Sequence, residues 1–544
     1  MNPTNSKIII LLTIVIVVTL AFLWPSSPSE PSKTKQVVKE NSSSNHVQKR
    51  HRFILTEDDS TIGNKLHPSE QKHVDSTKIS PGQTTLIAKD DEQYLAILER
   101  LEELGIRPRS TLEKLRSINV ILDDTTLAKL KKEFDEISAA QDTIVWIPED
   151  SIEPWSGRLG PSFGSHLLDW LGINASKENR GDGVVVAVLD TAISKSIVNP
   201  NANITQIDLF GYAQESAQAG HGNAVASLLV ANDRILAGLA PSIELLSIPV
   251  LDSNGEGTAF DVAMGIVAAV DAGANVISLS LGSYSSSSLM KAAVDYAAAA
   301  GVVMVAASGN DGTTQVVYPA AYDNVIAVSA VAFNSQIAGF SNSGSEVNLA
   351  APGVGINSAW TEDSGIVSFS GTSAAVPCVV GVIANILSDY GGSLSPTEAA
   401  NLVVNHTIDN GAPGKDNIYG TGVLDYIRAE NADKPGIIDA AFAGYFLDND
   451  NATKNKSVPL VVSAQNTGTE QLATMTLTVV VDDTEQSFTF VNVKPGETVS
   501  SILPISISQL EANGSVRVSS IVSTPDDIRP DNDKKNITIS ISSD

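Results

Sequence analysis

Residues 184–190 read VVVAVLD, a continuous apolar run that ends in an aspartate. Such a run is typical of a strand buried on both faces of a parallel sheet, because a strand with one wet face alternates apolar and polar residues. Similar runs occur at residues 276–280, 302–306 and 325–328, with alanine-rich helical stretches at 259–272 and 289–300 between them. This alternation predicts an α/β fold, an open and mostly parallel sheet with helices on both faces.

Four polar residues stand where such a fold places its sites, at the carboxyl ends of strands or at the start of helices. Asp190 directly follows the first run, and Asn310 follows the run at 302–306. His221 lies between two glycines at the apparent start of a helix. Ser373 precedes an apolar helical stretch, where the positive end of the helix dipole favours developing negative charge.

Each of these residues has an ordinary structural explanation. An aspartate after a strand is usually a cap, a lone histidine is usually structural, and a serine before a helix is usually an N-cap. The combination is more informative than its members. An acid, an imidazole, an amide donor and a hydroxyl within one domain are the groups that serine-based nucleophilic catalysis needs.

At this point residues 168–427 resemble the subtilisin-like serine peptidases (subtilases). The resemblance rests on several motifs in the family's order, at residues 186–191, 221–226, 238–241, 280–282, 306–310, 318–320 and 371–377. It implies that Ser373 attacks the peptide carbonyl, that His221 transfers the proton, and that Asp190 orients the imidazole. Asn310 would bind the oxyanion. The implied reaction is peptide-bond hydrolysis through an acyl-enzyme.

The resemblance also implies a groove in which substrate backbone pairs with the enzyme as an added strand. The residues expected to line it are Ser280, Leu281, Gly282, Gly255, Gly257 and Val317. One pocket of this groove would hold the substrate side chain that precedes the cleaved bond. Val317 stands at the floor of that pocket, where relatives often have a smaller residue. We therefore expect a shortened pocket that disfavours large aromatic side chains.

No cofactor is required for this chemistry, and no metal ligand is predicted. The loop at 231–235 is shorter than a calcium-binding loop of many relatives, so a structural calcium ion stays an open alternative. Cys378 is the single cysteine, which excludes an intramolecular disulfide and a multi-cysteine metal site. Because it lies in the apolar stretch after Ser373, we expect a small buried side chain.

The N-terminus predicts export. Residues 8–24 are apolar apart from two threonines. This apolar run is longer than the apolar region of a usual signal peptide and is at the short end for a membrane-spanning helix. We therefore assign residues 1–24 to a signal peptide or an N-terminal membrane anchor and residues 25–89 to a disordered linker. Either assignment puts the rest outside the cytoplasm, as a secreted protein or one anchored to the membrane by residues 8–24.

Two further domains flank the peptidase domain, which we place at 156–434. Residues 90–155 predict a small α+β module, which in this setting resembles the family's inhibitory propeptide. The chain would then cut itself between about residues 150 and 161; the alternative is a permanent accessory domain. Residues 436–544 alternate with period two between turn signals, which predicts a β-sandwich similar to CARDB-type and fibronectin-like modules.

The formal net charge of −27 argues against nucleic acid as a partner, since phosphate binding needs excess cations. The expected partners are protein or peptide substrates, the chain's own propeptide, and the membrane if the N-terminal segment is retained. The sequence thus predicts an exported, self-processed serine endopeptidase. Two alternatives stay open: a catalytically silent peptide-binding surface protein, and an adhesion protein whose peptidase only trims its own chain.

Overall fold

The structure is a computed structural model that describes residues 53–56, 79–148, 150–154, 163–177, 179–213, 219–233, 235–449 and 456–541. The predicted signal or anchor at residues 8–24 lies outside the described residues. So do residues 155–162, which make up most of the stretch predicted to hold the self-cleavage junction.

A seven-stranded sheet forms the centre of the peptidase domain, with strand order β14-β13-β12-β11-β7-β9-β8, and every neighbouring pair is parallel. The strands are β7 (Val185–Asp190), β8 (Asn203–Gln206), β9 (Glu244–Pro249), β11 (Val276–Leu279), β12 (Val303–Ala307), β13 (Ile326–Val331) and β14 (Val347–Pro352). The four apolar runs thus form β7, β11, β12 and β13, and the predicted fold class is confirmed. Along β7, Val186 and Val188 join one hydrophobic cluster while Ala187 and Leu189 join another, because the strand is buried on both faces.

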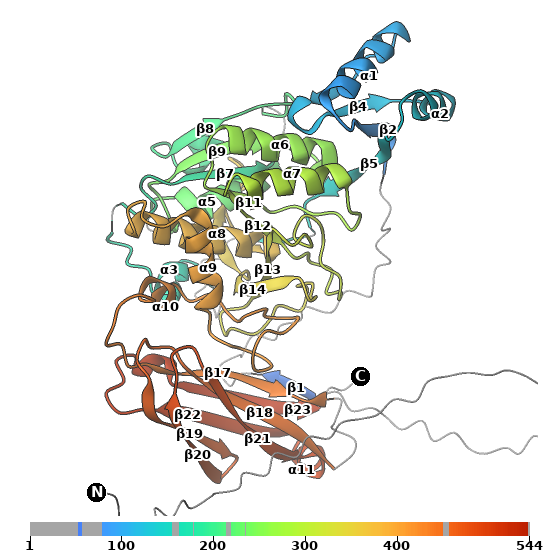
Figure 1. The fold of residues 1–544 in the computed structure, drawn as a ribbon. Coiled ribbons are helices and arrows are strands. Elements are labelled where there is room, and N and C mark those ends of the chain that lie inside the picture. Colours follow the sequence, from blue (N-terminus) through green and yellow to red (C-terminus); the bar gives the residue numbers. More distant parts are fainter. Residues whose placement is uncertain are drawn as a thin grey trace, which may run out of the picture. The chain divides into compact units, whose positions relative to one another are not determined.

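Helices cover both faces of this sheet (Figure 1). Helices α5 (His221–Val230) and α8 (Thr372–Asp389) pack together on one face, and α6 (Ala259–Asp271) and α7 (Ser288–Ala299) on the other. Shorter helices are α3 (Leu167–Leu171), α4 (Lys195–Val198), α9 (Pro396–Asn405) and α10 (Tyr426–Glu430).

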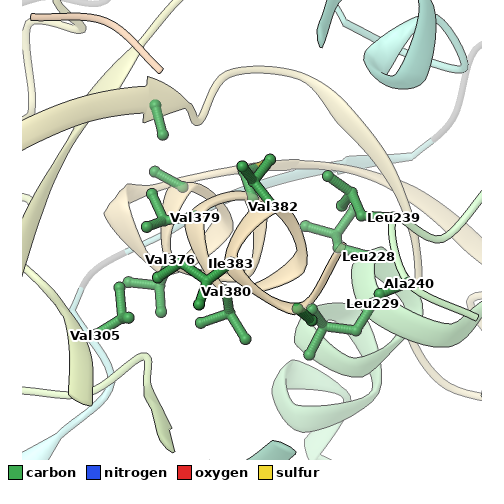
Figure 2. Close-up of a cluster of buried hydrophobic side chains, with 14 of the residues drawn as sticks. Leu228, Leu229, Leu239, Ala240, Val305, Val376, Val379, Val380, Val382 and Ile383 are labelled. Atoms are coloured by element: carbon green, nitrogen blue, oxygen red, sulfur yellow. The ribbon is translucent and has the colours of Figure 1, made fainter. Parts of the chain in front are cut away.

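Helix α8 forms the centre of the larger cluster. Figure 2 shows its valines and Ile383 packed against Leu228 and Leu229 of α5 and against Val305 of β12. The helix is long and apolar enough to cross a membrane, but nearly all of it is buried within the domain. Its burial fixes the position of its N-terminal turn, which carries Ser373.

The N-terminal module contains both strands and helices. It comprises β2 (Ile79–Ile87), α1 (Asp91–Glu103), β3 (Ser110–Leu112), β4 (Ser117–Ile121), α2 (Asp124–Glu133) and β5 (Ser138–Trp146). The sheet order is β10-β5-β2-β4-β3, so β10 (Glu256–Thr258) of the peptidase domain completes its edge. Strand β2 lies inside the stretch predicted as a linker. Its Pro81-Gly82 step and polar residues resemble a turn, and its pairing with β5 is irregular there.

Residues 440–449 and 456–541 form two antiparallel sheets around a common apolar core, as predicted. One sheet contains β17 (Ala440–Leu447), β18 (Ser457–Asn466) and β21 (Thr498–Ser506). The other contains β19 (Leu472–Val481), β20 (Thr484–Val493), β22 (Ser515–Ser523) and β23 (Lys534–Ile541), with α11 (Ile507–Asn513) beside them. Strand β1 (Phe53–Thr56) pairs antiparallel with β23 at the sheet edge.

Candidate active site

The structure brings Asp190 and His221 into direct contact. Asp190 ends β7 and His221 begins α5, and both side chains are buried. The imidazole Nδ1 lies 2.7 Å from Asp190 Oδ1 and 2.9 Å from Oδ2. The backbone amide of Thr191 donates to Oδ1 at 2.7 Å, which fixes the carboxylate. This arrangement holds the imidazole so that Nε2 points away from Asp190.

Glycines on both sides of His221 allow this placement. Gly220 has a φ of 80°, in the left-handed region that favours glycine. A side chain at Gly222 would collide with the backbone oxygen of Thr191, whose Oγ1 accepts the Gly222 amide at 2.9 Å. The glycines that made this histidine distinctive in the sequence thus have a steric role.

Asn310 follows β12 and has a fixed amide orientation. Its Oδ1 accepts the backbone amide of Thr372 at 2.8 Å and the Thr372 hydroxyl at 2.7 Å. Since the oxygen is used in this way, the Nδ2 group faces the predicted active site as a donor. This is the orientation that an oxyanion-binding amide needs.

Ser373 is the second residue of α8 and is fully buried. Its backbone oxygen accepts the Ser280 hydroxyl at 3.0 Å, which ties α8 to the end of β11. Among the described residues its Oγ has no hydrogen bond of good geometry, although it lies beside the carboxylate of Asp150. The structure therefore collects all four predicted residues, but it does not join Ser373 to His221 directly.

Asp150 occupies the space between them, and the sequence analysis did not place it in the site. Its Oδ2 lies 2.9 Å from His221 Nε2, and its Oδ1 accepts the Asn310 amide at 2.6 Å. The side chain is 3% exposed. In the sequence, only the position of Asp150 near the predicted self-cleavage junction pointed to this residue. No local motif marks a carboxylate of one module that contacts the active site of another.

The two carboxylates shift the titration of the imidazole. Burial alone would lower the pKa of His221, but Asp190 and Asp150 outweigh it and raise the pKa to about 10. Burial raises the pKa of Asp150, while its contacts with His221, Ser373 and Asn310 act in the opposite direction. The proton between His221 Nε2 and Asp150 Oδ2 therefore belongs to the pair, and the two groups titrate together.

The chain beside Asp150 follows the expected groove. Trp146, at the end of β5, exchanges backbone hydrogen bonds with Gly282 at 2.9 and 3.0 Å and pairs on its other side with Glu256. The Ile147 amide donates to the Gly255 oxygen at 3.1 Å. Beyond Asp150, β6 (Ser151–Pro154) pairs with β16 (Ile366–Ser370), which in turn pairs with β15 (Ile356–Ala359).

The predicted groove residues fall into two groups. Gly255, Gly257 and Gly282 contact or pair with the N-terminal segment through their backbones. Ser280 instead supports Ser373, and the Leu281 side chain packs in the core.

Val317 is buried between two glycines. A side chain at Gly282 would collide with its Cγ2, and one at Gly309 would lie 3.2 Å from its Cγ1. It therefore fills space beside both segments.

No three histidine, cysteine, aspartate or glutamate side chains of the described residues are grouped so that they could hold a metal ion. In the 231–235 loop, Asp233 accepts the backbone amides of Ile235 and Leu236 at 2.6 and 2.7 Å. Cys378 is free and buried, as expected, and burial raises the pKa of its thiol.

Comparison with known proteins assigns the family. The Subtilase family matches residues 181–422. The chain is 34% identical to a thermostable alkaline protease of Halalkalibacterium halodurans, over 68% of this chain and 95% of that protein, and 38% identical to subtilisin DY of Bacillus licheniformis, over 45% of this chain and 90% of that protein. Fervidolysin from Fervidobacterium pennivorans shares the fold, with a TM-score of 0.56 and 18% identity over 86% of this chain and 93% of fervidolysin. The chain therefore belongs to the subtilase family and is a serine endopeptidase.

Proposed function

We propose that the chain hydrolyses peptide bonds with Ser373 as nucleophile, His221 as general base and acid, and Asp190 as the group that orients the imidazole. The observation that carries this assignment is the contact of His221 Nδ1 with both oxygens of a buried Asp190 carboxylate. That contact assigns the proton of Nδ1 and leaves Nε2 as the reactive nitrogen.

The reaction follows from these positions. Ser373 Oγ attacks the carbonyl carbon of the substrate while Nε2 takes the hydroxyl proton, and the Asn310 amide donates to the oxygen that becomes negative. The C–N bond then breaks, Nε2 gives its proton to the leaving amine, and an acyl-enzyme remains. Water activated by the same imidazole hydrolyses the ester and restores Ser373. The chain's own side chains complete this cycle.

The proposal includes processing from an exported precursor. The N-terminal module would act as propeptide, since its last strand lies in the groove that a substrate would use. Residues 8–24 would direct export and then be removed or serve as a membrane anchor. The mature protein would be secreted or held at the cell surface.

For substrates we propose proteins or peptides with a small or medium aliphatic side chain before the cleaved bond. Val317 supports this because it fills space next to Gly282 and Gly309 in the predicted pocket. A structural calcium ion remains an open alternative. The sandwich is proposed to bind substrate or a surface, or to stabilise the enzyme.

The full chain tests this proposal through three variants: the wild type, Ser373→Ala, and Ser176→Ala as a control at an exposed serine. We expect the wild type and the control to react with a fluorophosphonate probe, hydrolyse casein and acquire a new N-terminus between about residues 150 and 161. Ser373→Ala should do none of these.

Two results would redirect the assignment. A folded wild type whose peptidase domain never reacts with the probe, even after its N-terminal segment is cut and removed, would favour the silent peptide-binding protein. A wild type that cuts itself but not casein would favour the adhesion protein that only trims its own chain.

A further inference from the structure

We propose that Asp150 is an internal latch: the uncut chain is inactive while the Asp150 carboxylate occupies the oxyanion position and engages the catalytic base, so the first cut requires Asp150 to leave this position. This inference rests on the proposed serine mechanism and adds to it a specific side chain that sets latency. The N-terminal module would then inhibit through a charged group as well as by lying in the groove.

The carboxylate has the partners of a reacting oxygen. Asn310 Nδ2 donates to Oδ1 at 2.6 Å, and this amide is the one that the mechanism assigns to the oxyanion. A side chain at Gly371 would collide with the same Oδ1, so the carboxylate lies directly against the glycine that precedes α8. A substrate carbonyl oxygen cannot enter this space while Asp150 fills it.

The same carboxylate removes the base. If it is ionised, it accepts a hydrogen bond from the Nε2–H group, and the imidazole, which also donates from Nδ1 to Asp190, is a cation with no free lone pair. If it is protonated, it donates to the Nε2 lone pair. In both forms Nε2 is unable to take the proton of Ser373, whose Oγ lacks a well-formed hydrogen bond among the described residues.

The backbone holds Asp150 in this position from both sides. Ile147 is the last residue bonded to the Gly255 side of the groove, and Ser151 is the first paired with Ser370 on the other side. Asp150 therefore lies between two anchored flanks, at the catalytic centre. Because both flanks are anchored, the carboxylate is an intramolecular ligand with high effective concentration, and it need not bind tightly by itself.

The test compares the full chain carrying Asp150→Ala or Asp150→Asn with the wild type. Asp135→Ala serves as a matched control, because Asp135 is an exposed aspartate of the same module. The measured quantity is the initial rate at which a fluorophosphonate labels the uncut band at pH 8, and each chain is also made with Ser373→Ala to define the background. A sample of each chain is cut in its N-terminal segment, the released segment is removed, and the remaining chain is labelled in parallel.

We expect Asp150→Ala to be labelled at least tenfold faster than the wild type and the control to stay within twofold of it. Asp150→Asn should fall between them, because it keeps the shape of the latch and removes its charge. Equal labelling of uncut wild type and Asp150→Ala, with fast labelling of both cut chains, would overturn the latch and leave the serine mechanism intact. Failure of every cut and uncut chain to react would overturn the serine mechanism and the latch with it.

Discussion

The hydroxyl of Thr372 donates to Asn310 Oδ1 at 2.7 Å, and its backbone amide donates to the same oxygen at 2.8 Å. An amide side chain can present either its oxygen or its nitrogen to a site, and the choice is made by its hydrogen bonds. The two hydrogen bonds from Thr372 fix the orientation of the Asn310 amide. The residue next to the proposed nucleophile therefore positions the proposed oxyanion donor.

Replacement of this threonine tests the relationship. Thr372→Val keeps the size and the backbone bond but loses the hydroxyl, so we expect kcat of the processed enzyme to fall about tenfold with KM nearly unchanged. Thr372→Ser should restore most of the activity. The check is steady-state kinetics with one peptide substrate. An equal fall in Thr372→Ser would mean that packing of the methyl group matters more than the hydroxyl.

The pKa of the His221 imidazole can distinguish the effect of Asp150 from that of Asp190. In the uncut chain, carried in the Ser373→Ala background, His221 should stay protonated until the pH approaches its pKa of about 10. Removal of one carboxylate by Asp150→Ala should lower this pKa by about one unit or more. Nitrogen NMR of labelled histidine measures both values, and His221→Gln identifies the resonance. A titration near pH 6.5 in both chains would contradict the Asp150 contact.

Val317 offers a test of specificity. Val317→Ala removes the methyl groups next to Gly282 and Gly309, so we expect kcat/KM for peptides with phenylalanine before the cleaved bond to rise at least tenfold relative to alanine. Since Val317 is buried, the change should also cost about 2 kcal/mol of stability. A peptide library reports the first effect and thermal unfolding the second. A wild-type profile that already peaks at phenylalanine would refute the filled pocket.

We expect Asp142 to make docking of the N-terminal module depend on pH. Its oxygens accept the Asn119 amide at 2.7 Å and the Phe260 backbone amide of α6 at 3.3 Å, and burial raises the pKa of Asp142 to about 6. Because the docked state binds this proton more tightly, its contribution is complete below the ordinary pKa of 3.8 and is lost as pH rises through about 6.

The dissociation constant of the cut module should therefore increase roughly tenfold or more between pH 4 and pH 7. Asp142→Asn, which is neutral at both pH values, should remove most of that dependence. Binding of the cut module measured by analytical gel filtration or inhibition at each pH provides the check. A slope that persists in Asp142→Asn would assign the pH dependence to another group.

The central sheet could be predicted because β7, β11, β12 and β13 are buried on both faces and so consist of continuous apolar residues. Strand β2 could not, since its Pro81-Gly82 step carries the signal of a turn and residues 80–85 are largely polar. Only pairing with β4 and β5, which are distant in sequence, makes it a strand.

In the candidate active site, too, only residues marked by a local sequence pattern could be predicted. Asp190, His221, Asn310 and Ser373 were found because each follows a strand or begins a helix in a recognisable motif. Asp150 lies 71 residues from His221, in a separate module, and no local pattern marks it. Its contact depends on how β5 and β6 are anchored, which is a property of the tertiary structure.

The edge pairing of β1 with β23 has a consequence for how the processed protein would behave. The N-terminal portion is attached to the sandwich through β1 and to the peptidase through β5, so scission at the predicted junction between about residues 150 and 161 would leave two polypeptides joined by sheet hydrogen bonds. A denaturing gel would show two bands where size-exclusion chromatography shows one species. The onset of proteolysis would then follow the slow separation of these fragments, and the covalent event itself would be silent.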